Sequence, residues 1–447
     1  MDELEYLCLM AKKIKDQKAI LDKLGIEALN PMQVAAQEAI RKHADVVLLS
    51  PTGTGKTLAF LLPIIEGLDP QSDQIQVLIV VPSRELAIQI EQVIREMGSG
   101  YKTNAVYGGR SGSKDRMDLK HAPAILVGTP GRVADHIRRE AIYTEDIQTL
   151  VLDEFDKSLE VGFELEMREI IDAMPGLKKK ILTSATQGVE IPSFVRLYES
   201  QQLDFLGTTK SQLRIQRVLS SSRNKLDALV QLLAHTGEGN GIVFCSLKDT
   251  IQGVSDFLRQ HGVEHVCFYG GLEQIDRERA LIQFRNGSSR LLVATDLAAR
   301  GIDVPALDFI IHFEMPFKEE EFTHRNGRTA RMNSHGTAYV LQWENEKLPD
   351  FVLESEEIQL QSGRVIENSP WETLYLSGGR KDKISKGDIA GLFLKQGGLQ
   401  RDELGMIELK QDAAFVAVPK SQSSRLIQQL NNAKLKTKKV RIGRLSK

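Results

Sequence analysis

A strand, a glycine-rich turn and a helix in direct succession constrain the fold of this chain more than any other feature. The turn is Ser50–Thr57, between the apolar runs Val46–Leu49 and Leu58–Leu62. Its glycines let backbone N–H groups approach an anion, and the helix N-terminus adds partial positive charge. Lys56 is suited to the β- and γ-phosphates of a nucleotide and Thr57 to Mg²⁺. The turn therefore predicts a nucleotide site with these contact residues: Thr52, Gly53, Thr54, Gly55, Lys56 and Thr57.

Ser50 stands where the usual phosphate-loop pattern has glycine, so a tight turn that binds nothing is the alternative. Two acidic residues favour the nucleotide site over that alternative. Asp153 and Glu154 follow the apolar run Leu150–Leu152, and open parallel sheets bind ligands at the carboxyl ends of their strands. Asp153 is suited to hold Mg²⁺ through water, and Glu154 to orient or deprotonate an attacking water. An acidic pair alone is usually a solvated loop, but in this context we expect a catalytic pair.

A cluster of basic residues lies much later in the chain. The segment His324–Arg331 holds three arginines and a histidine within eight residues. Positions 324, 328 and 331 fall on one face of a helix by the i, i+4, i+7 rule. Because clustered like charges repel unless an anion lies opposite, we expect Arg328 and Arg331 to stabilise a γ-phosphate during transfer. A salt-bridged surface helix is the alternative.

Short apolar runs alternate with amphipathic stretches in two successive series, which indicates parallel sheets buried on both faces. The first series predicts strands at Val46–Leu49, Val77–Val81, Ala124–Val127, Leu150–Leu152 and Ile181–Thr183. The second predicts strands at Gly241–Cys245, His265–Tyr269, Arg290–Ala294, Phe309–Phe313 and Ala338–Leu341. We therefore expect two α/β domains, at residues 1–207 and 213–345, then a connector at 346–370 and a small α+β domain at 371–447 with the order β-α-β-β-α-β.

Charge is distributed unevenly along the chain. Residues 371–447 carry 16 Lys+Arg against 7 Asp+Glu, whereas the preceding 370 residues carry 42 against 53. A compact basic domain on an acidic body suggests a module for polyanions, and a solvated face that balances the charge is the alternative. The three cysteines are scattered and the apolar runs are far too short to span a membrane. We therefore expect a cytoplasmic protein with no membrane association.

Taken together, the motifs resemble those of DEAD-box RNA helicases over about residues 20–345, in the order expected for that family. They are Asn30–Gln33, Ser50–Thr57, Pro82–Leu86, Gly108–Gly109, Thr129–Arg132, Asp153–Asp156, Ser184–Thr186, Ile242–Ser246, Gln274–Arg277, Ala294–Asp303 and His324–Arg331. The resemblance implies two tandem RecA-like domains and an RNA-stimulated ATPase that uses ATP and Mg²⁺, separates short duplexes locally and acts as a monomer.

The resemblance also implies roles for single residues. Gln33 would read the adenine edge, and Asp296 and Asp303 would help to hold the ribose and the γ-phosphate. The residues expected to grip RNA phosphates and 2′-hydroxyls, without reading sequence, are Pro82, Arg84, Gly109, Thr129, Gly131, Arg132 and Thr295. Ser184 and Thr186 would couple the nucleotide site to RNA through Asp156 and the arginine motif that begins at His324.

Two positions depart from the family pattern. Phe155 replaces an alanine in the acidic motif, where overpacking typically costs about 1–3 kcal/mol; it removes no catalytic group, so we expect activity to survive. The second is the aromatic that normally stacks on adenine: Cys8 falls near its place and Tyr6 is the closest ring, so the pattern does not predict stacking on adenine, whereas Gln33 is kept. An RNA-binding clamp or chaperone whose turnover Phe155 has silenced is one alternative function. Independently of these departures, a DNA helicase of related architecture is another.

The C-terminal segment resembles the RNA-binding domain of DbpA-type helicases, a divergent RRM, through Thr373–Lys383 and Lys386–Ile389. Phe415 is the one aromatic kept on the expected sheet, where it either stacks on a base or belongs to the core. The resemblance implies docking on a hairpin of large-subunit rRNA near the peptidyl-transferase centre, and hence a role in ribosome assembly. The expected RNA contacts are Arg380, Lys381, Lys383, Lys434, Lys436, Lys438, Lys439 and Arg441.

Overall fold

A computed structural model describes residues 16–109, 112–160, 162–186, 190–207, 213–296, 304, 307–329, 335–352, 355–360 and 366–445. The chain forms two compact units, the first running to residue 211 and the second taking almost all of the remainder. None of the helices in these ranges is long and apolar enough to cross a membrane. Of the cysteines within them, Cys245 is buried, Cys267 is half-buried, and both are free thiols.

The first unit is a seven-stranded parallel sheet in the order β3-β4-β2-β5-β6-β1-β7. Its strands are β1 (Asp45–Leu49), β2 (Val77–Val80), β3 (Thr103–Val106), β4 (Ile125–Gly128), β5 (Thr149–Leu152), β6 (Lys179–Ser184) and β7 (Gln201–Asp204). Its helices are α2 (Gln17–Leu24), α3 (Pro31–Lys42), α4 (Lys56–Glu66), α5 (Arg84–Met97), α6 (Gly112–Leu119), α7 (Pro130–Arg138), α8 (Phe155–Glu160) and α9 (Glu164–Asp172).

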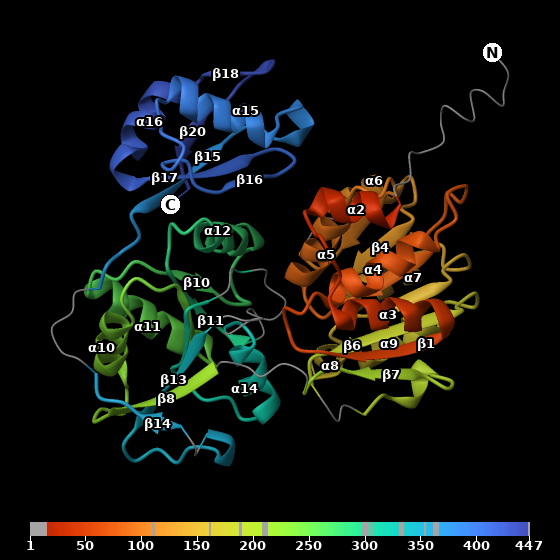
Figure 1. Cartoon of the computed structure of the whole chain (residues 1–447), viewed down its shortest axis with the longest axis horizontal. Coiled ribbons are helices and arrows are strands. Elements are labelled where there is room, and N and C mark those ends of the chain that lie inside the picture. Colours follow the sequence, from red (N-terminus) through yellow and green to blue (C-terminus); the bar gives the residue numbers. More distant parts are fainter. Residues whose placement is uncertain are drawn as a thin grey trace. The chain divides into compact units, whose positions relative to one another are not determined.

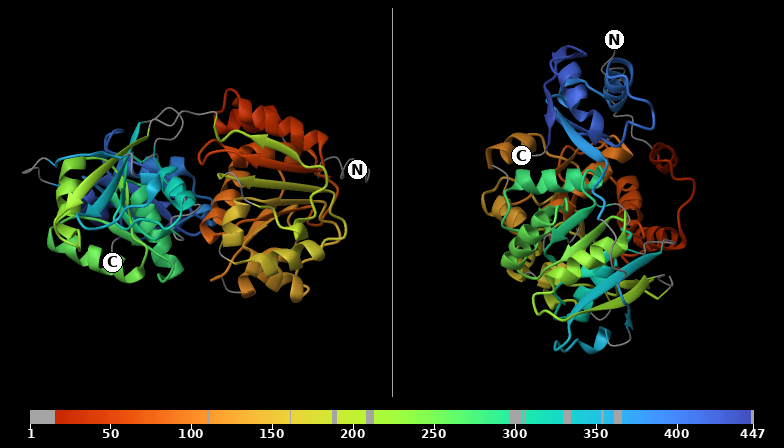
Figure 2. Two further views of the ribbon diagram at one scale, coloured as in Figure 1. Left: turned by 90° about the horizontal axis from the view of Figure 1, so that it is seen from below. Right: turned by 90° about the vertical axis from the view of Figure 1, so that its left-hand side faces the viewer.

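Alternate strand residues of this sheet enter two separate apolar cores. Val46 and Ile79 pack with the apolar faces of α4 and α5, whereas Val47 and Leu78 pack with those of α7 and α9. Helices accordingly cover both faces of the sheet (Figure 2, left). This two-sided burial explains why the strands read as continuous apolar runs.

The second unit contains another seven-stranded parallel sheet, in the order β10-β11-β9-β12-β13-β8-β14. Its strands are β8 (Leu213–Ser220), β9 (Gly241–Phe244), β10 (Val266–Phe268), β11 (Leu291–Ala294), β12 (Phe309–His312), β13 (Gly336–Trp343) and β14 (Glu356–Glu357). The helices around it are α10 (Leu226–Thr236), α11 (Lys248–Gln260), α12 (Gln274–Arg285) and α14 (Glu319–Asn326).

The second unit ends in a four-stranded antiparallel sheet, drawn in blue in Figure 1, in the order β16-β17-β15-β20. Its elements are β15 (Trp371–Leu376), α15 (Lys386–Gly391), β16 (Ile407–Leu409), β17 (Ala414–Pro419), α16 (Ser423–Leu430), the hairpin β18 (Lys434–Leu435) and β19 (Lys438–Lys439), and β20 (Ile442–Arg444). Leu374, Ile389, Val416 and Leu426 belong to its core.

The predicted fold class, two parallel-sheet α/β domains and a small α+β domain, is confirmed, and each of the ten strands predicted in the two parallel sheets is present. Sequence inspection missed β3, β7, β8 and β14, which are polar or alternating segments at or near sheet edges. One local prediction is wrong: His324 and Arg328 do not share a helix face, because α14 ends at Asn326 and Gly327 caps it. Arg331, Asp303, Cys8 and Tyr6 lie outside the described residues.

Candidate nucleotide and RNA site

The phosphate loop connects the end of β1 to the start of α4. Gly53 and Gly55 have φ angles of +82° and +87°, in the left-handed region that favours glycine. A Cβ atom on Gly55 would lie 2.5 Å from Nε2 of Gln33, so the end of that flexible side chain would have to move if another residue stood there. Gly55 is also the N-cap of α4 and offers no side chain to its N–H groups. The loop therefore presents a helix N-terminus suited to an anion.

Ser50, the departure from the usual phosphate-loop pattern, braces the loop. Its buried hydroxyl shares a hydrogen bond of 2.8 Å with Oγ1 of Thr54, which donates to the carbonyl of Pro51 at 2.9 Å. Nζ of Lys56 donates to the carbonyls of Ser50 and Pro51 at 2.6 and 3.0 Å. The lysine ammonium therefore lies inside the loop that would surround the phosphates.

Gln33 lies against the same loop. Its Oε1 accepts from the backbone N–H of Asn30 as half of a capping box at the start of α3, and its Nε2 donates to the carbonyl of Gly55 at 3.3 Å. Asn30 Nδ2 donates to the carbonyl of Thr54 at 3.0 Å. The residue expected to read adenine is thus joined directly to the phosphate loop.

The acidic pair follows β5 at the same edge of the sheet. Asp153 is buried, and the hydroxyl of Thr183 donates to its Oδ1. Burial raises the pKa of Asp153 above its ordinary range, while the Thr183 hydrogen bond and the charge of Lys56 act in the opposite direction. Glu154 has a φ of +50°, uncommon for a residue other than glycine. Its backbone N–H donates to Oγ1 of Thr183 at 3.2 Å.

The residues expected to couple the site to RNA are hydrogen-bonded to one another. Oγ1 of Thr186 donates to Oδ2 of Asp156 at 2.9 Å, and the N–H of Thr186 donates to Oγ of Ser184 at 3.0 Å. Phe155, between Glu154 and Asp156, is 2% exposed and belongs to the core shared with α7 and α9. The larger side chain is therefore absorbed by the core and does not enter the acidic site.

The RNA-binding candidates of the first unit follow β2, β3 and β4, at the edge that also carries the phosphate loop and the acidic pair. Arg84 packs against the glycine turn after β3, where a Cβ on Gly109 would lie 2.5 Å from its guanidinium.

Thr129 is the buried N-cap residue of α7. Arg132 donates to Oδ2 of the buried Asp115 at 2.7 and 2.8 Å. Pro82 is buried, and a Cβ on Gly131 would meet open space.

In the second unit, Thr295 and Asp296 follow β11. The guanidinium of Arg325 donates to both carboxylate oxygens of Asp296, at 2.5 and 2.6 Å, and to the carbonyl of Glu314 at 2.6 Å. Arg325 is 2% exposed. Sequence reasoning noted this arginine but assigned it no role; the signal was its place beside His324 in the arginine motif. His324 is half-buried on α14, and Arg328 is buried just beyond that helix.

His312 lies beside this ion pair. Its ring is fully buried, shares a 3.0 Å hydrogen bond with Oδ1 of Asn326, and lies tilted against Phe322 with the ring centres 4.5 Å apart. Burial and the charge of Arg325 lower the pKa of His312 to about 3. The imidazole is therefore neutral at physiological pH.

Phe415 belongs to a core and does not present a free ring. It is 8% exposed and clusters with Ile282 of α12 and with Leu445, beside Tyr375. Arg285 of α12 makes a paired salt bridge with Glu408 of β16, at 2.8 to 3.1 Å. Of the two alternatives for Phe415, packing in a core is the one observed.

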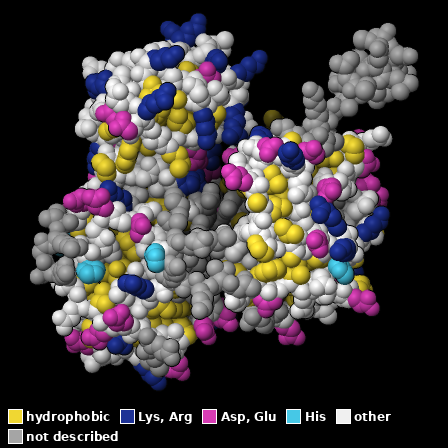
Figure 3. All heavy atoms as spheres, viewed as in Figure 1, with side chains coloured by type: hydrophobic (Ala, Val, Ile, Leu, Met, Phe, Trp, Pro, Cys, Tyr) yellow, Lys and Arg dark blue, Asp and Glu magenta, His cyan; other side chains and the backbone are white. Residues whose placement is uncertain are grey.

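The basic candidates of the C-terminal domain are exposed or half-buried around the hairpin β18–β19 and the turn after β15. Basic side chains stand out on this domain, at the upper left of Figure 3. Lys436 and Lys438 pair with Asp388 and Asp382 at 2.9 and 2.8 Å, and Lys381 lies 3.8 Å from Asp412. The other predicted contacts here are Arg380, Lys383, Lys434, Lys439 and Arg441.

The residues present fit ATP and Mg²⁺. The left-handed glycines and the N-terminus of α4 suit a phosphate chain, and the hydroxyl of Thr57 and the carboxylate of Asp153 are oxygen donors of the kind Mg²⁺ prefers. Within the described ranges, no cluster of three or more His, Cys, Asp or Glu is placed to hold a metal.

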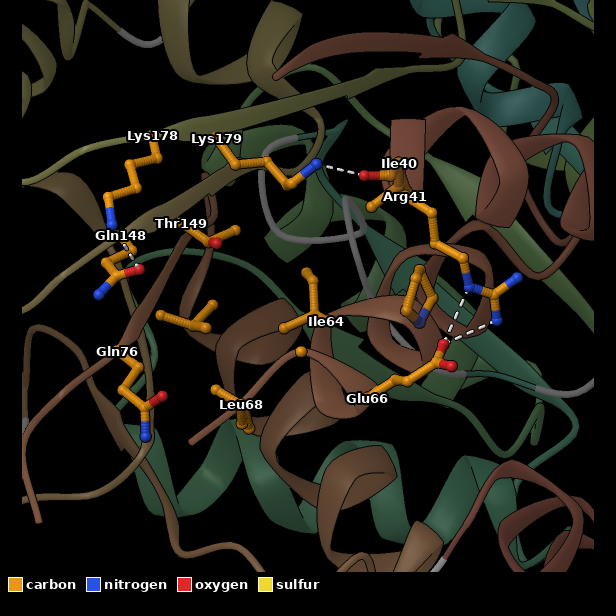
Figure 4. A pocket seen from close by; sticks show the side chains of 13 residues that line it. Ile40, Arg41, Ile64, Glu66, Leu68, Gln76, Gln148, Thr149, Lys178 and Lys179 are labelled. Carbon is orange, nitrogen blue, oxygen red and sulfur yellow. Dashed lines mark hydrogen bonds and ion pairs between the residues drawn. The ribbon is translucent and has the colours of Figure 1, made fainter. Parts of the chain in front are cut away.

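A pocket of about 430 Å³ lies at the amino ends of the strands of the first sheet, where β2 and β5 begin and opposite to the candidate site. Figure 4 shows Arg41 and Glu66 paired at its rim, and Lys179 directed to the carbonyl of Ile40. None of the predicted site residues lines it. This pocket is therefore not part of the candidate nucleotide and RNA site.

Comparison with known proteins covers nearly the whole chain. The chain matches three protein-family models: DEAD/DEAH box helicase at residues 30–193, Helicase conserved C-terminal domain at 224–333 and DbpA RNA binding domain at 373–444. The chain is 33% identical to the ATP-dependent RNA helicase DbpA of Escherichia coli K12, over 94% of this chain and 95% of that protein. It is 29% identical to the protein of the same name in Bacillus subtilis 168, over 96% and 97%.

Solved structures with the same fold include S. cerevisiae Dbp5 bound to RNA and ADP BeF3, with a TM-score of 0.67 and 23% identity, covering 77% of this chain and 94% of that one. Mss116 bound to ssRNA and UDP-BeF has a TM-score of 0.67 and 22% identity, covering 79% and 80%. At sequence identities this low, the likeness to these two structures shows a shared fold and nothing further.

Proposed function

The chain belongs to the DbpA group of DEAD-box ATP-dependent RNA helicases, and from that premise we propose that it remodels large-subunit rRNA during ribosome assembly. Its general activity is that of an RNA-stimulated ATPase and helicase. The observation that carries the narrower proposal is the C-terminal domain, which matches the DbpA RNA-binding domain over residues 373–444 and has a net charge of +9 from Trp371 to Lys447. We further propose that the protein acts as a monomer in the cytoplasm.

The nucleotide chemistry is assigned to the phosphate loop and the acidic pair. Backbone N–H groups at the start of α4 and the ammonium of Lys56 bind the phosphates, and Gln33 recognises adenine beside them. Thr57 and, through water, Asp153 would hold Mg²⁺, which would neutralise phosphate charge when bound. Glu154 orients the attacking water and accepts its proton. Arg328 and Arg331 stabilise the charge of the phosphoryl group in transfer, with Asp296 and Asp303 holding the nucleotide.

Target selection is assigned to the C-terminal domain, because contacts to phosphates and 2′-hydroxyls carry no sequence information. Its sheet is occupied by α12 near Phe415, so we place RNA on the basic hairpin and the turn after β15. Lys434, Lys439 and Arg441 are exposed there. A folded rRNA hairpin suits such a surface better than a single strand stacked across the sheet.

The test is a full-length variant with Lys434, Lys439 and Arg441 changed to Ala, compared with a charge-matched control that changes the exposed Lys18, Lys42 and Arg168 of the first unit. We expect the first variant to need much more rRNA hairpin for half-maximal ATPase. Its binding should also lose about 0.7–0.9 in salt slope for each phosphate contact removed. If it still preferred the rRNA hairpin to unrelated RNA of equal length, the targeting role would be refuted.

The alternative of an RNA clamp with a silenced nucleotide site rested on Phe155. That side chain is packed in the core and leaves Asp153 and Glu154 in place. Measuring phosphate release at saturating RNA decides between the two: release supports the helicase, and none supports the clamp.

A further inference from the structure

Thr183 joins the two acidic residues of the nucleotide site, although no sequence motif includes it. It is fully buried in β6 and follows Leu182, which is paired in register with Leu152 of β5. Its hydroxyl donates to Oδ1 of Asp153 and accepts from the backbone N–H of Glu154 at 3.2 Å. One side-chain oxygen therefore contacts both Asp153 and Glu154.

Each of these hydrogen bonds restricts a different degree of freedom. The donated bond engages one carboxylate oxygen of Asp153, which fixes the rotation of that carboxylate. The accepted bond holds the peptide of Glu154, whose φ of +50° is unusual for a residue with a Cβ. Such a conformation persists only where the surroundings hold it, and it is common at functional sites. The β-branched side chain of Thr183 has few χ1 choices, so the hydroxyl is itself well placed.

We propose that Thr183 is a positioning residue that orients Asp153 and Glu154 for the metal–nucleotide complex. The proposal rests on the proposed function, which makes these two carboxylates the metal-binding and water-orienting groups. Groups that orient metal ligands from behind typically contribute about 10–100-fold to metal affinity or activity. The hydroxyl, and not the volume of the side chain, is the part of Thr183 that carries this effect.

The experiment measures Mn²⁺ affinity of the full-length protein with ADP by electron paramagnetic resonance, beside RNA-stimulated kcat. Three variants separate the hydroxyl from the shape. T183V keeps the volume without the hydroxyl, T183A lacks both, and T183S keeps the hydroxyl. T149V is the control for losing a threonine hydroxyl, because Thr149 is at the start of β5 and so at the end of the sheet away from the acidic pair. We expect T183V and T183A to bind Mn²⁺ about tenfold or more weakly, and T183S and T149V to resemble wild type.

Two results would overturn the inference: wild-type Mn²⁺ affinity in T183V, or affinity in T183S as low as in T183V. If T183V does not fold, the comparison of T183A with T183S decides in the same way. D153N separates this inference from the function on which it rests. If D153N keeps wild-type Mn²⁺ affinity, the metal assignment of Asp153 fails. If D153N loses Mn²⁺ and T183V does not, only the role of Thr183 fails.

Discussion

Arg325 holds Asp296 through two hydrogen bonds of 2.5 and 2.6 Å, one to each carboxylate oxygen. The guanidinium also lies 5.0 Å from the ring centre of Phe244 and donates to the carbonyl of Glu314. Asp296, proposed to contact the nucleotide, is thus fixed by an arginine buried in the second unit. The pair links the segment after β11 to helix α14.

Replacing Arg325 by Lys should lower RNA-stimulated kcat about tenfold or more, because a lysine cannot make the paired geometry and a small misplacement is costly in catalysis. R259K is the control, since Arg259 pairs with Asp256 on the exposed surface of α11. ATPase assays of both variants provide the measurement. Equal turnover in R325K and R259K would show that the buried pair has no role in hydrolysis.

Replacing Glu154 by Gln should trap the protein on RNA. The amide keeps the size of the carboxylate but cannot accept a proton from water. In ATP the variant should dissociate from RNA more slowly than wild type, which fluorescence anisotropy of a labelled RNA would measure. Dissociation at the wild-type rate would mean that another group orients the water.

Replacing Phe155 by Ala should destabilise the first unit and spare the chemistry. Removing a buried phenyl group typically costs about 3–5 kcal/mol, and the ring belongs to the core and not to the site. F60A, a fully buried phenylalanine of the opposite core, is the matched control. At a temperature where both variants are folded, kcat should be close to wild type in both. A specific loss in F155A would show that the ring also shapes the acidic site.

Stability of the second unit should fall as pH drops below about 6.5, because of His312. Burial lowers its folded pKa to about 3 from an ordinary 6.5, so the unfolded chain takes up a proton that the folded chain does not. Between about pH 7.5 and 5.5 this removes about 1.4 kcal/mol. Both tryptophans, Trp343 and Trp371, report on this unit in urea titrations.

The variant H312Q should lose that part of the pH dependence, since glutamine does not titrate. H261Q, which removes an exposed histidine, should keep it. The same urea midpoints, measured at both pH values for the three proteins, provide the comparison. If H312Q and wild type lost equal stability on acidification, another group would be responsible.

What could be predicted from the sequence depended on how local the signal was. Strands such as β1 and β9 are buried on both faces and stand out as apolar runs, and the phosphate loop is one continuous segment. Thr183 and Arg325 were assigned no role because their partners lie 30 and 29 residues away and meet them only in the folded sheets. The edge strands β7 and β14 are too polar or too short to be distinguished from loops.

The salt bridge between Arg285 and Glu408 gives the last prediction, because it joins α12 of the helicase part to the C-terminal sheet of the same unit. Burial alone would raise the pKa of Glu408, but Lys410 and Arg285 hold it below its usual range. The carboxylate is therefore charged at neutral pH. A docked C-terminal domain keeps its bound RNA at a high effective concentration near the helicase part.

R285A should therefore raise the amount of rRNA hairpin needed for half-maximal ATPase, while leaving kcat at saturating RNA and stimulation by unrelated RNA near wild type. K420A is the control: Lys420 pairs with Glu264 across the same two domains, but both side chains are more than 40% exposed, and such pairs contribute little. In a double-mutant cycle, R285A and E408A should show a coupling of about 0.5–3 kcal/mol in the unfolding followed by Trp371. Additive effects, together with a hairpin requirement no higher in R285A than in K420A, would mean that docking through this salt bridge does not serve RNA targeting.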